Sequence, residues 1–154
     1  MTLRPAPRAI VPTSIVAAVL LPITFVQADV RSAPCGRYVV DADTVKDTKT
    51  GLTWQRTIDT NVYDWSQALQ YCRDLAGAGG GWRLPTYWEL QSIIDETRTN
   101  PAIDVDVFPG TPSIYFWTSS PYVGDSSGAW VVAFSDGITF YDDVTLAWRA
   151  RCVR

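Results

Sequence analysis

The segment spanning residues 81–90 constrains the fold most, because its sequence reads as a corner between an extended segment and a helix. Pro85 ends the extended segment, and Thr86 stands where a helix should begin. Thr86 and Glu89 have the spacing of a capping box, in which each side chain accepts a hydrogen bond from the other residue's backbone N–H. The corner contains no histidine and no cluster of metal ligands. It therefore predicts fold rather than activity, and we expect function to lie in the loops between residues 105 and 128.

Residues 1–28 have the pattern of a signal peptide. Arg4 and Arg8 precede a largely apolar run over residues 10–26, and small residues at Val26 and Ala28 suit cleavage after Ala28. A membrane anchor is the alternative, but prolines interrupt the run. We therefore expect an exported protein (periplasmic, cell-surface or extracellular) whose mature chain has no membrane span.

The mature chain has the length of one domain and is acidic. Without Arg4 and Arg8, 11 basic residues stand against 16 acidic ones, a net charge of −5. Nucleic-acid binding needs a basic surface, so we expect no nucleic-acid partner. The chain has no histidine, which excludes His-ligated zinc and Ser-His or Cys-His catalysis.

Apolar periodicity predicts two helices, over residues 64–76 and 87–96, and several short strands. Asp136-Gly137 between two apolar runs predicts a hairpin. The expected fold class is α+β, with two helices, a small antiparallel sheet and long loops. Residues 29–37 are expected to be a lead-in and residues 38–154 the domain. The expected strands cover residues 38–40, 52–56, 115–119, 129–134, 138–141 and 147–153.

The three cysteines suit one disulfide and one leftover thiol. Cys72 falls in a predicted helix and Cys152 in a predicted terminal strand, so a bond between them would close a long loop. Cys35 lies between Pro34 and Gly36, and we expect it to be the odd thiol.

Four sequence motifs occur in order, at residues 47–55, 71–75, 81–90 and 151–154. Together they resemble the DUF1566 family, also called the Lcl C-terminal domain after a Legionella collagen-like adhesin. The resemblance covers about residues 38–154. It implies a C-type lectin-like fold related to formylglycine-generating enzymes, and a Cys72–Cys152 disulfide. In the adhesin the domain is associated with binding sulfated glycosaminoglycans; the present chain has no collagen-like region, so trimerisation does not carry over.

The same resemblance raises an oxygenase as the alternative function. Formylglycine-generating enzymes hold copper with a pair of cysteines, whereas only Cys152 lies near this C-terminus. We therefore expect no catalytic residues, no cofactor and no metal, and the capping box explains the shared motif without catalysis. A structural calcium is a further alternative, because Asp41, Asp43 and Asp47 have loose loop spacing. No complete calcium-binding loop accompanies them.

The aromatic residues give the candidates for ligand binding. Four of the seven tryptophans fall on predicted apolar faces or in the family motifs and are expected in the core. Trp88 falls beside the buried stripe of its helix. Trp117 and Trp130 border polar loops, and with Tyr115 and Tyr122 they form the candidate recognition surface. The four expected core tryptophans are Trp54, Trp65, Trp82 and Trp148.

Arginines near the C-terminus are a second candidate, since guanidinium groups suit sulfate and carboxylate groups. Arg149, Arg151 and Arg154 are nevertheless expected to form an ordinary solvated strand face, because the net charge would oppose a polyanion. We expect a non-enzymatic binding or surface-interaction module for an extracellular polysaccharide or a surface protein. A purely structural domain without a ligand is the remaining alternative.

Overall fold

The computed structural model describes residues 36–75 and 80–154, all of which belong to one unit of the chain, residues 31–154. The predicted signal peptide, residues 29–35 of the predicted lead-in and Cys35 lie outside the described residues. No helix within the described ranges is long and apolar enough to cross a membrane.

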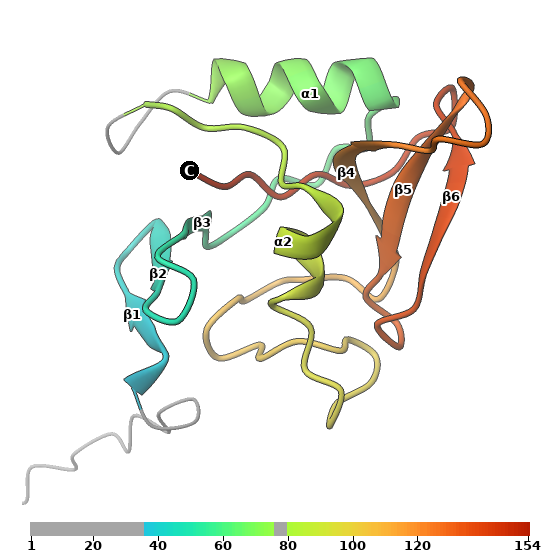
Figure 1. Ribbon diagram of the computed structural model, residues 1–154. Coiled ribbons are helices and arrows are strands. Elements are labelled where there is room, and N and C mark those ends of the chain that lie inside the picture. The colour runs from blue at the N-terminus through green and yellow to red at the C-terminus, as the bar shows by residue number, and fades with distance from the viewer. Residues whose placement is uncertain (1–35, 76–79) are drawn as a thin grey trace, which may run out of the picture. The chain divides into compact units, whose positions relative to one another are not determined.

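The described strands form two antiparallel sheets of three strands each (Figure 1). The first sheet has the order β1, β2, β3 and the second the order β4, β5, β6. Helices α1 and α2 lie between the two sheets in the sequence. The elements are β1 (Tyr38–Val40), β2 (Thr44–Asp47), β3 (Thr53–Gln55), α1 (Trp65–Asp74), α2 (Tyr87–Gln91), β4 (Tyr115–Pro121), β5 (Gly128–Ala133) and β6 (Thr139–Asp143).

The expected α+β class with one small sheet is wrong, because the described chain is mostly β with two antiparallel sheets and two short helices. The C-type lectin-like fold that the resemblance implied stays a prediction. Strand β2 was missed because two of its four residues, Lys46 and Asp47, are charged. The expected second helix stops at Gln91, since the backbone N–H of Asp95 donates to the carbonyl of Ala102 rather than continuing the helix. The expected terminal strand is reduced to isolated bridges, among them one between Val153 and Trp54.

The second sheet is packed on both faces. On one face, Phe116 and Val132 join a core that includes Leu90 of α2. On the other face, Trp117 and Val131 join a core that includes Cys72 of α1. Successive residues of a strand point to opposite faces, so the paired strands β4 and β5 supply both cores at once. The sheet is therefore covered by α2 on one side and α1 on the other.

The predicted hairpin is confirmed, since β5 and β6 pair directly across the Asp136-Gly137 turn. Gly137 has φ of 82°, a left-handed conformation that favours glycine. Its backbone N–H donates to the carbonyl of Ala133 at 2.8 Å. This turn sets the register that places β6 beside β5.

The C-terminal residues connect otherwise distant elements. Cys152 forms a disulfide with Cys72 of α1, the pairing that the resemblance implied. The carbonyl of Cys152 accepts a hydrogen bond from the backbone N–H of Gln55, at the end of β3. Val153 exchanges backbone hydrogen bonds of 2.9 Å with Arg83, just before α2. The end of the chain therefore holds α1, β3 and the α2 corner in one unit.

Arg151 is fully buried, so the expectation of a solvated arginine face is wrong for this residue. Its guanidinium donates to the carbonyls of Gln55 and Arg56 at 2.6 and 2.8 Å. It also donates to the hydroxyl of Thr111 at 2.6 Å and lies 4.9 Å from the centre of the Phe108 ring. Burial lowers the pKa of Arg151 to about 9, so the side chain stays charged at neutral pH. Carbonyl dipoles, rather than a carboxylate, stabilise this buried charge.

Replacing Arg151 should destabilise the fold strongly. In Arg151→Met, two carbonyls and a hydroxyl lose their buried donor, and we expect the free energy of unfolding to fall by about 3 kcal/mol. Arg151→Lys keeps the charge but not the planar fork, and should lie between Met and the native residue. Urea unfolding followed by tryptophan fluorescence measures the difference.

Arg73→Met is the matched control, because Arg73 is exposed in the last turn of α1. We expect this control to change the free energy of unfolding by no more than about 0.5 kcal/mol. Equal stability of Arg151→Met and Arg73→Met would contradict a central role for Arg151.

Candidate functional site

Five aromatic side chains form a continuous surface on the face of the second sheet that α2 covers in part. Tyr87 and Trp88 come from α2, Tyr122 follows β4, Trp130 belongs to β5 and Tyr141 to β6. Neighbouring ring centres are separated by 3.8 to 6.4 Å. We call these five residues the aromatic surface.

The pairing of β5 with β6 creates one half of this surface. Trp130 and Tyr141 are direct partners in the antiparallel ladder, so their side chains lie on the same face. Tyr122 stacks on Tyr141 with ring centres 3.8 Å apart and an angle of 2° between the planes. Both rings fit because a glycine, Gly128, lies under them: an added Cβ there would be 3.2 Å from Tyr141 and 3.4 Å from Tyr122. The stacked pair thus depends on a position without a side chain.

Helix α2 supplies the other half. The ring of Tyr87 lies 5.2 Å from that of Trp130 and 4.7 Å from that of Trp88. The backbone N–H of Tyr87 donates to the Ser120 hydroxyl at 3.0 Å, and its own hydroxyl lies 3.3 Å from that of Thr139. These contacts to β4 and β6 fix Tyr87 in place without any ligand.

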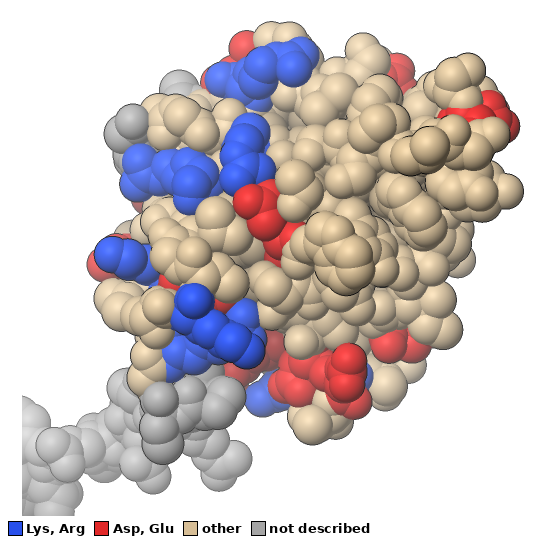
Figure 2. All heavy atoms as spheres, viewed as in Figure 1, with Lys and Arg blue, Asp and Glu red and all other residues tan. Residues whose placement is uncertain are grey.

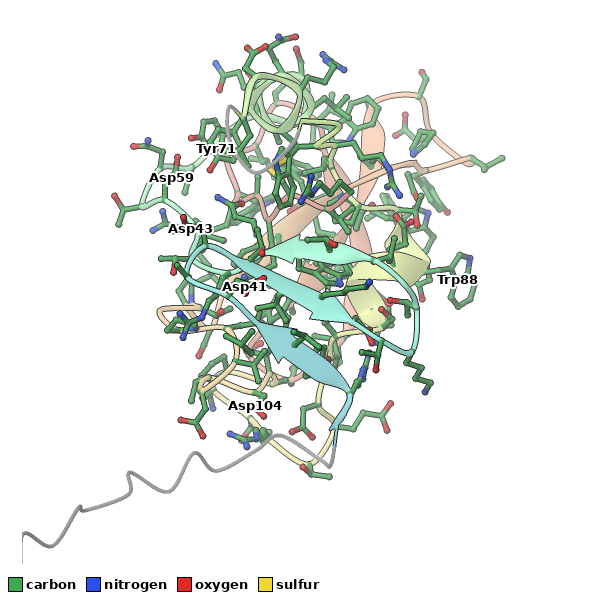
Figure 3. All side chains as sticks on the ribbon, turned by 90° about the vertical axis from the view of Figure 1, so that its left-hand side faces the viewer. Asp41, Asp43, Asp59, Tyr71, Trp88 and Asp104 are labelled. Carbon is green, nitrogen blue, oxygen red and sulfur yellow. A yellow bond between two sulfur atoms is a disulfide. The ribbon has the colours of Figure 1, made fainter. Side chains whose placement is uncertain are left out.

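Trp88 is the most exposed ring of the surface. Its exposed fraction is 77%, against 49% for Tyr141. Figure 3 shows the Trp88 side chain pointing away from the body of the fold. Tryptophan is normally highly buried, and Trp54 and Trp117 of this chain are completely so. Trp88 thus projects an exposed indole beside the ring of Tyr87, at one end of the aromatic surface.

An open pocket of about 320 Å³ lies within the aromatic surface. It is lined by Tyr87, Trp88, Trp130 and the hydroxyl-bearing Ser120. Ligand pockets typically begin near this size and combine apolar walls with a few polar groups. The lining contains no carboxylate, amine, imidazole or thiol group. It is formed by three aromatic rings and one hydroxyl-bearing side chain.

The corner predicted from the sequence holds Trp88 in position. The hydroxyl of Thr86 accepts from the N–H of Glu89 at 3.3 Å, and the Glu89 carboxylate accepts from the N–H of Thr86 at 2.8 Å. The capping box is therefore confirmed. The guanidinium of Arg83 adds two hydrogen bonds of 2.7 Å to the same carboxylate. Arg83 and then Thr86 lower the pKa of Glu89 to about 2.

Charge is distributed unevenly around the aromatic surface. The sequence has no Lys or Arg between Arg98 and Arg149, a stretch that includes β4, β5 and β6. It does have aspartates there, and Asp125 and Asp143 are exposed. Figure 2 shows Lys and Arg mainly on the left of the view, over the first sheet, the C-terminal end and part of α1, while the second sheet on the right is uncharged or acidic. The aromatic surface therefore has no cationic side chain on its own strands.

The structure separates the four residues predicted for ligand recognition into two pairs. Tyr122 and Trp130 lie together on the aromatic surface. Trp117 is buried, and its indole N–H donates to the carbonyl of Tyr63 at 2.8 Å. Tyr115 is half-buried and packs edge-on against Phe140, on the opposite face of the sheet from Trp130. Tyr115 and Trp117 thus belong to the α1 side of the sheet.

Sequence reasoning missed Tyr87, Trp88 and Tyr141 as site residues; Tyr87 has the spacing of the buried stripe of its helix. The sequence did contain a signal for Trp88, because a large apolar residue outside the buried stripe of its helix is expected to be exposed. Tyr141 had none, because only the β5–β6 register places it opposite Trp130. The four tryptophans expected in the core are there or packed against it; Trp54 and Trp82 are buried, and Trp65 and Trp148 are partly so.

Most of the other candidates for ligand or metal binding contact other residues of the fold. Arg149 donates to the carbonyl of Asn61 at 2.9 Å, and Arg154 lies over the ring of Trp82. Asp47 is buried and forms an ion pair of 2.7 Å with Arg37, whereas Asp41 and Asp43 are exposed near the β1–β2 turn (Figure 3). Across residues 36–75 and 80–154, no three His, Cys, Asp or Glu side chains are grouped to hold a metal ion.

Comparison with protein families matches residues 43–154 to the Lcl C-terminal domain. The match begins just before β2 and continues to the last residue, so it includes the α2 corner, the disulfide and the aromatic surface. Among proteins with curated descriptions, none matches the chain significantly.

The depressed pKa of Glu89 predicts an acid-dependent loss of stability. Its carboxylate is stabilised in the folded state, so its contribution is complete above about pH 5 and is lost as the pH falls toward 2. We expect only about 1 kcal/mol, because the Arg83 partner is largely solvated. Urea unfolding of the native protein and Glu89→Gln should therefore differ at pH 7 and converge near pH 2.

Glu96→Gln is the control for this titration, because Glu96 is exposed and lies outside the corner. The control should follow the native protein at every pH. A Glu89→Gln difference that stays constant from pH 7 to pH 2 would show that the carboxylate charge is not what stabilises the corner.

Proposed function

The chain belongs to the Lcl C-terminal domain family, and we propose that it is a non-enzymatic, exported module that binds a polysaccharide on its aromatic surface. Trp88 carries this proposal. A tryptophan with 77% of its surface exposed leaves apolar area in water whose burial would stabilise a complex by about 3 kcal/mol. The Thr86–Glu89 capping box and the Arg83 ion pair fix the backbone that carries Trp88, and the ring of Tyr87 packs edge-on against the indole.

The chemistry of the surface suits a sugar ring. A pyranose presents a flat face of C–H groups surrounded by hydroxyls. Aromatic rings such as Trp88 and Trp130 can cover the C–H face, while the hydroxyls of Ser120 and Thr139 offer hydrogen bonds at the side. The open form of the pocket favours a polymer that passes over the surface rather than a small metabolite enclosed by it.

Two observations favour binding over catalysis. General acid–base catalysis usually relies on a histidine, carboxylate, lysine or cysteine within hydrogen-bonding reach of the substrate, and none of these residue types lines the pocket. A copper-dependent oxygenase would need free thiolates, whereas Cys152 is committed to its disulfide with Cys72. The same disulfide is typical of an oxidising compartment, which supports export.

Replacing Trp88 tests the proposal. Trp88→Ala should weaken binding to a polysaccharide at least tenfold, because the ligand loses its main stacking surface. It should leave thermal stability nearly unchanged, since the ring is mostly exposed already. Affinity electrophoresis through gels containing individual polysaccharides measures binding, and circular dichroism measures the melting temperature.

Val62→Ala provides a matched control, because Val62 is a half-exposed apolar residue outside the aromatic surface. This variant should bind as the native protein does. If the native protein binds no polysaccharide, or if Trp88→Ala binds equally well, the proposed function is wrong.

A further inference from the structure

We infer that the ligand of the aromatic surface is an uncharged polysaccharide, recognised over more than one sugar unit, and not a sulfated or uronic one. This inference rests on the proposed function and specifies the ligand class of the same site. It follows from the charges around the surface, from the polar groups that it offers and from the arrangement of its rings.

The charges next to the surface would repel a polyanion. Asp143 follows Tyr141 by two residues and Asp125 follows Tyr122 by three, and both aspartates are exposed. The backbone N–H and hydroxyl of Ser127 lower the pKa of Asp125, so it remains ionised. Thr145 bonds Asp143 in the same way, at 2.9 and 2.7 Å. Asp125 and Asp143 thus form a border of the aromatic surface, called the rim below, that is negative at neutral pH.

No cation on the three strands compensates for this rim. Recognition of sulfate or carboxylate groups normally uses arginine or lysine side chains, and residues 99–148 contain neither. Arg83, which contacts α2 beside Trp88, is already bonded through two nitrogens to Glu89. Lys46 and Lys49 are exposed, but they belong to the first sheet and the turn that follows β2. A sulfated chain bound on the aromatic rings would therefore leave its charges without partners.

The polar groups that the surface does offer are neutral hydroxyls. Ser120 lines the pocket, and Thr139 lies against the hydroxyl of Tyr87. A hydroxyl both donates and accepts, as do the hydroxyls of a sugar. Such groups can pair with an uncharged sugar without leaving a buried charge.

The rings form two stacking positions joined by Trp130. Trp130 contacts Tyr87 beside Trp88 at one end and the stacked pair of Tyr122 and Tyr141 at the other. The exposed fractions of Trp88 and Tyr141 leave both ends accessible. A ligand that covers both positions must contain several sugar units, so oligosaccharides should bind at least tenfold more tightly than the monosaccharide.

The test compares neutral polysaccharides with their own sulfated derivatives, so that only charge differs within a pair. Dextran with dextran sulfate is one such pair, and β-glucans, galactomannans and their sulfated forms extend the panel. We expect at least one neutral polymer to bind ten times or more tightly than its sulfated form. Its affinity should be nearly constant from about 50 to about 500 mM NaCl, because no ion pair contributes.

Two variants locate the binding. Tyr141→Ala and Trp88→Ala should each weaken retention of the neutral polymer at least tenfold, since they remove different stacking positions.

A third variant tests the charge of the rim. Asp125→Lys, which places a cation on the rim, should improve binding of the sulfated derivative while leaving that of the neutral polymer unchanged.

The outcomes separate the two proposals. Preferential binding of a sulfated polymer that depends on Trp88 would overturn the inference and leave the proposed function standing. Salt-sensitive binding of sulfated polymers that ignores Trp88 and Tyr141 would overturn both. Binding of a monosaccharide as tightly as its oligosaccharide would overturn the claim of several sugar units.

Discussion

The fold depends on the buried guanidinium of Arg151. Its positive charge is stabilised by the dipoles of two carbonyls and a hydroxyl rather than by a carboxylate. Its three short hydrogen bonds join the end of β3 to Thr111, in the long connection before β4. A carboxylate partner would have required a second buried charge, whereas backbone carbonyls are present wherever the chain passes. This arrangement requires a defined backbone geometry, because the carbonyls of Gln55 and Arg56 must both point at one group. Arg151 therefore orders segments that have no regular secondary structure of their own.

Part of one face of the second sheet is left uncovered by the two cores. The α2 side of the sheet is covered by Leu90 and Ile93 only over part of its length, and Trp130 and Tyr141 lie beyond that cover. Helix α2 is five residues long, too short to bury the remainder. The same short helix presents Trp88 outward while it places Tyr87 against the sheet. Two consecutive residues of one helix therefore have different surroundings, since Tyr87 packs against the sheet and Trp88 projects into solvent.

Sequence reasoning succeeded where the interacting groups are neighbours in the chain. Thr86 with Glu89, and Asp136 with Gly137, act over one to three residues, and both the capping box and the hairpin are confirmed. It failed where the interacting residues are far apart in the sequence. The carbonyls that hold Arg151 are 95 and 96 residues away, so alternation alone placed this residue on a solvated face. Likewise, β2 is recognisable only by its pairing with β1 and β3.

The same distinction explains the candidate site. Trp130 and Tyr122 border polar loops and could be selected from local sequence, but Trp117 borders the same loops and is buried. The two faces of β4 and β5 are both apolar, so the usual alternation of polar and apolar residues does not reveal which ring faces solvent. Which rings are buried and which are exposed depends on α1 and α2, because they cover different parts of the two faces.

The burial of residues 151–153 has a consequence for how the domain can unfold. Arg151, Cys152 and Val153 are all buried and contact elements from α1, β3 and the α2 corner. Val153 belongs to one hydrophobic core and Cys152 to the other. Detachment of this short segment would therefore open both cores together, so the two sheets form one cooperative unit rather than two independent ones.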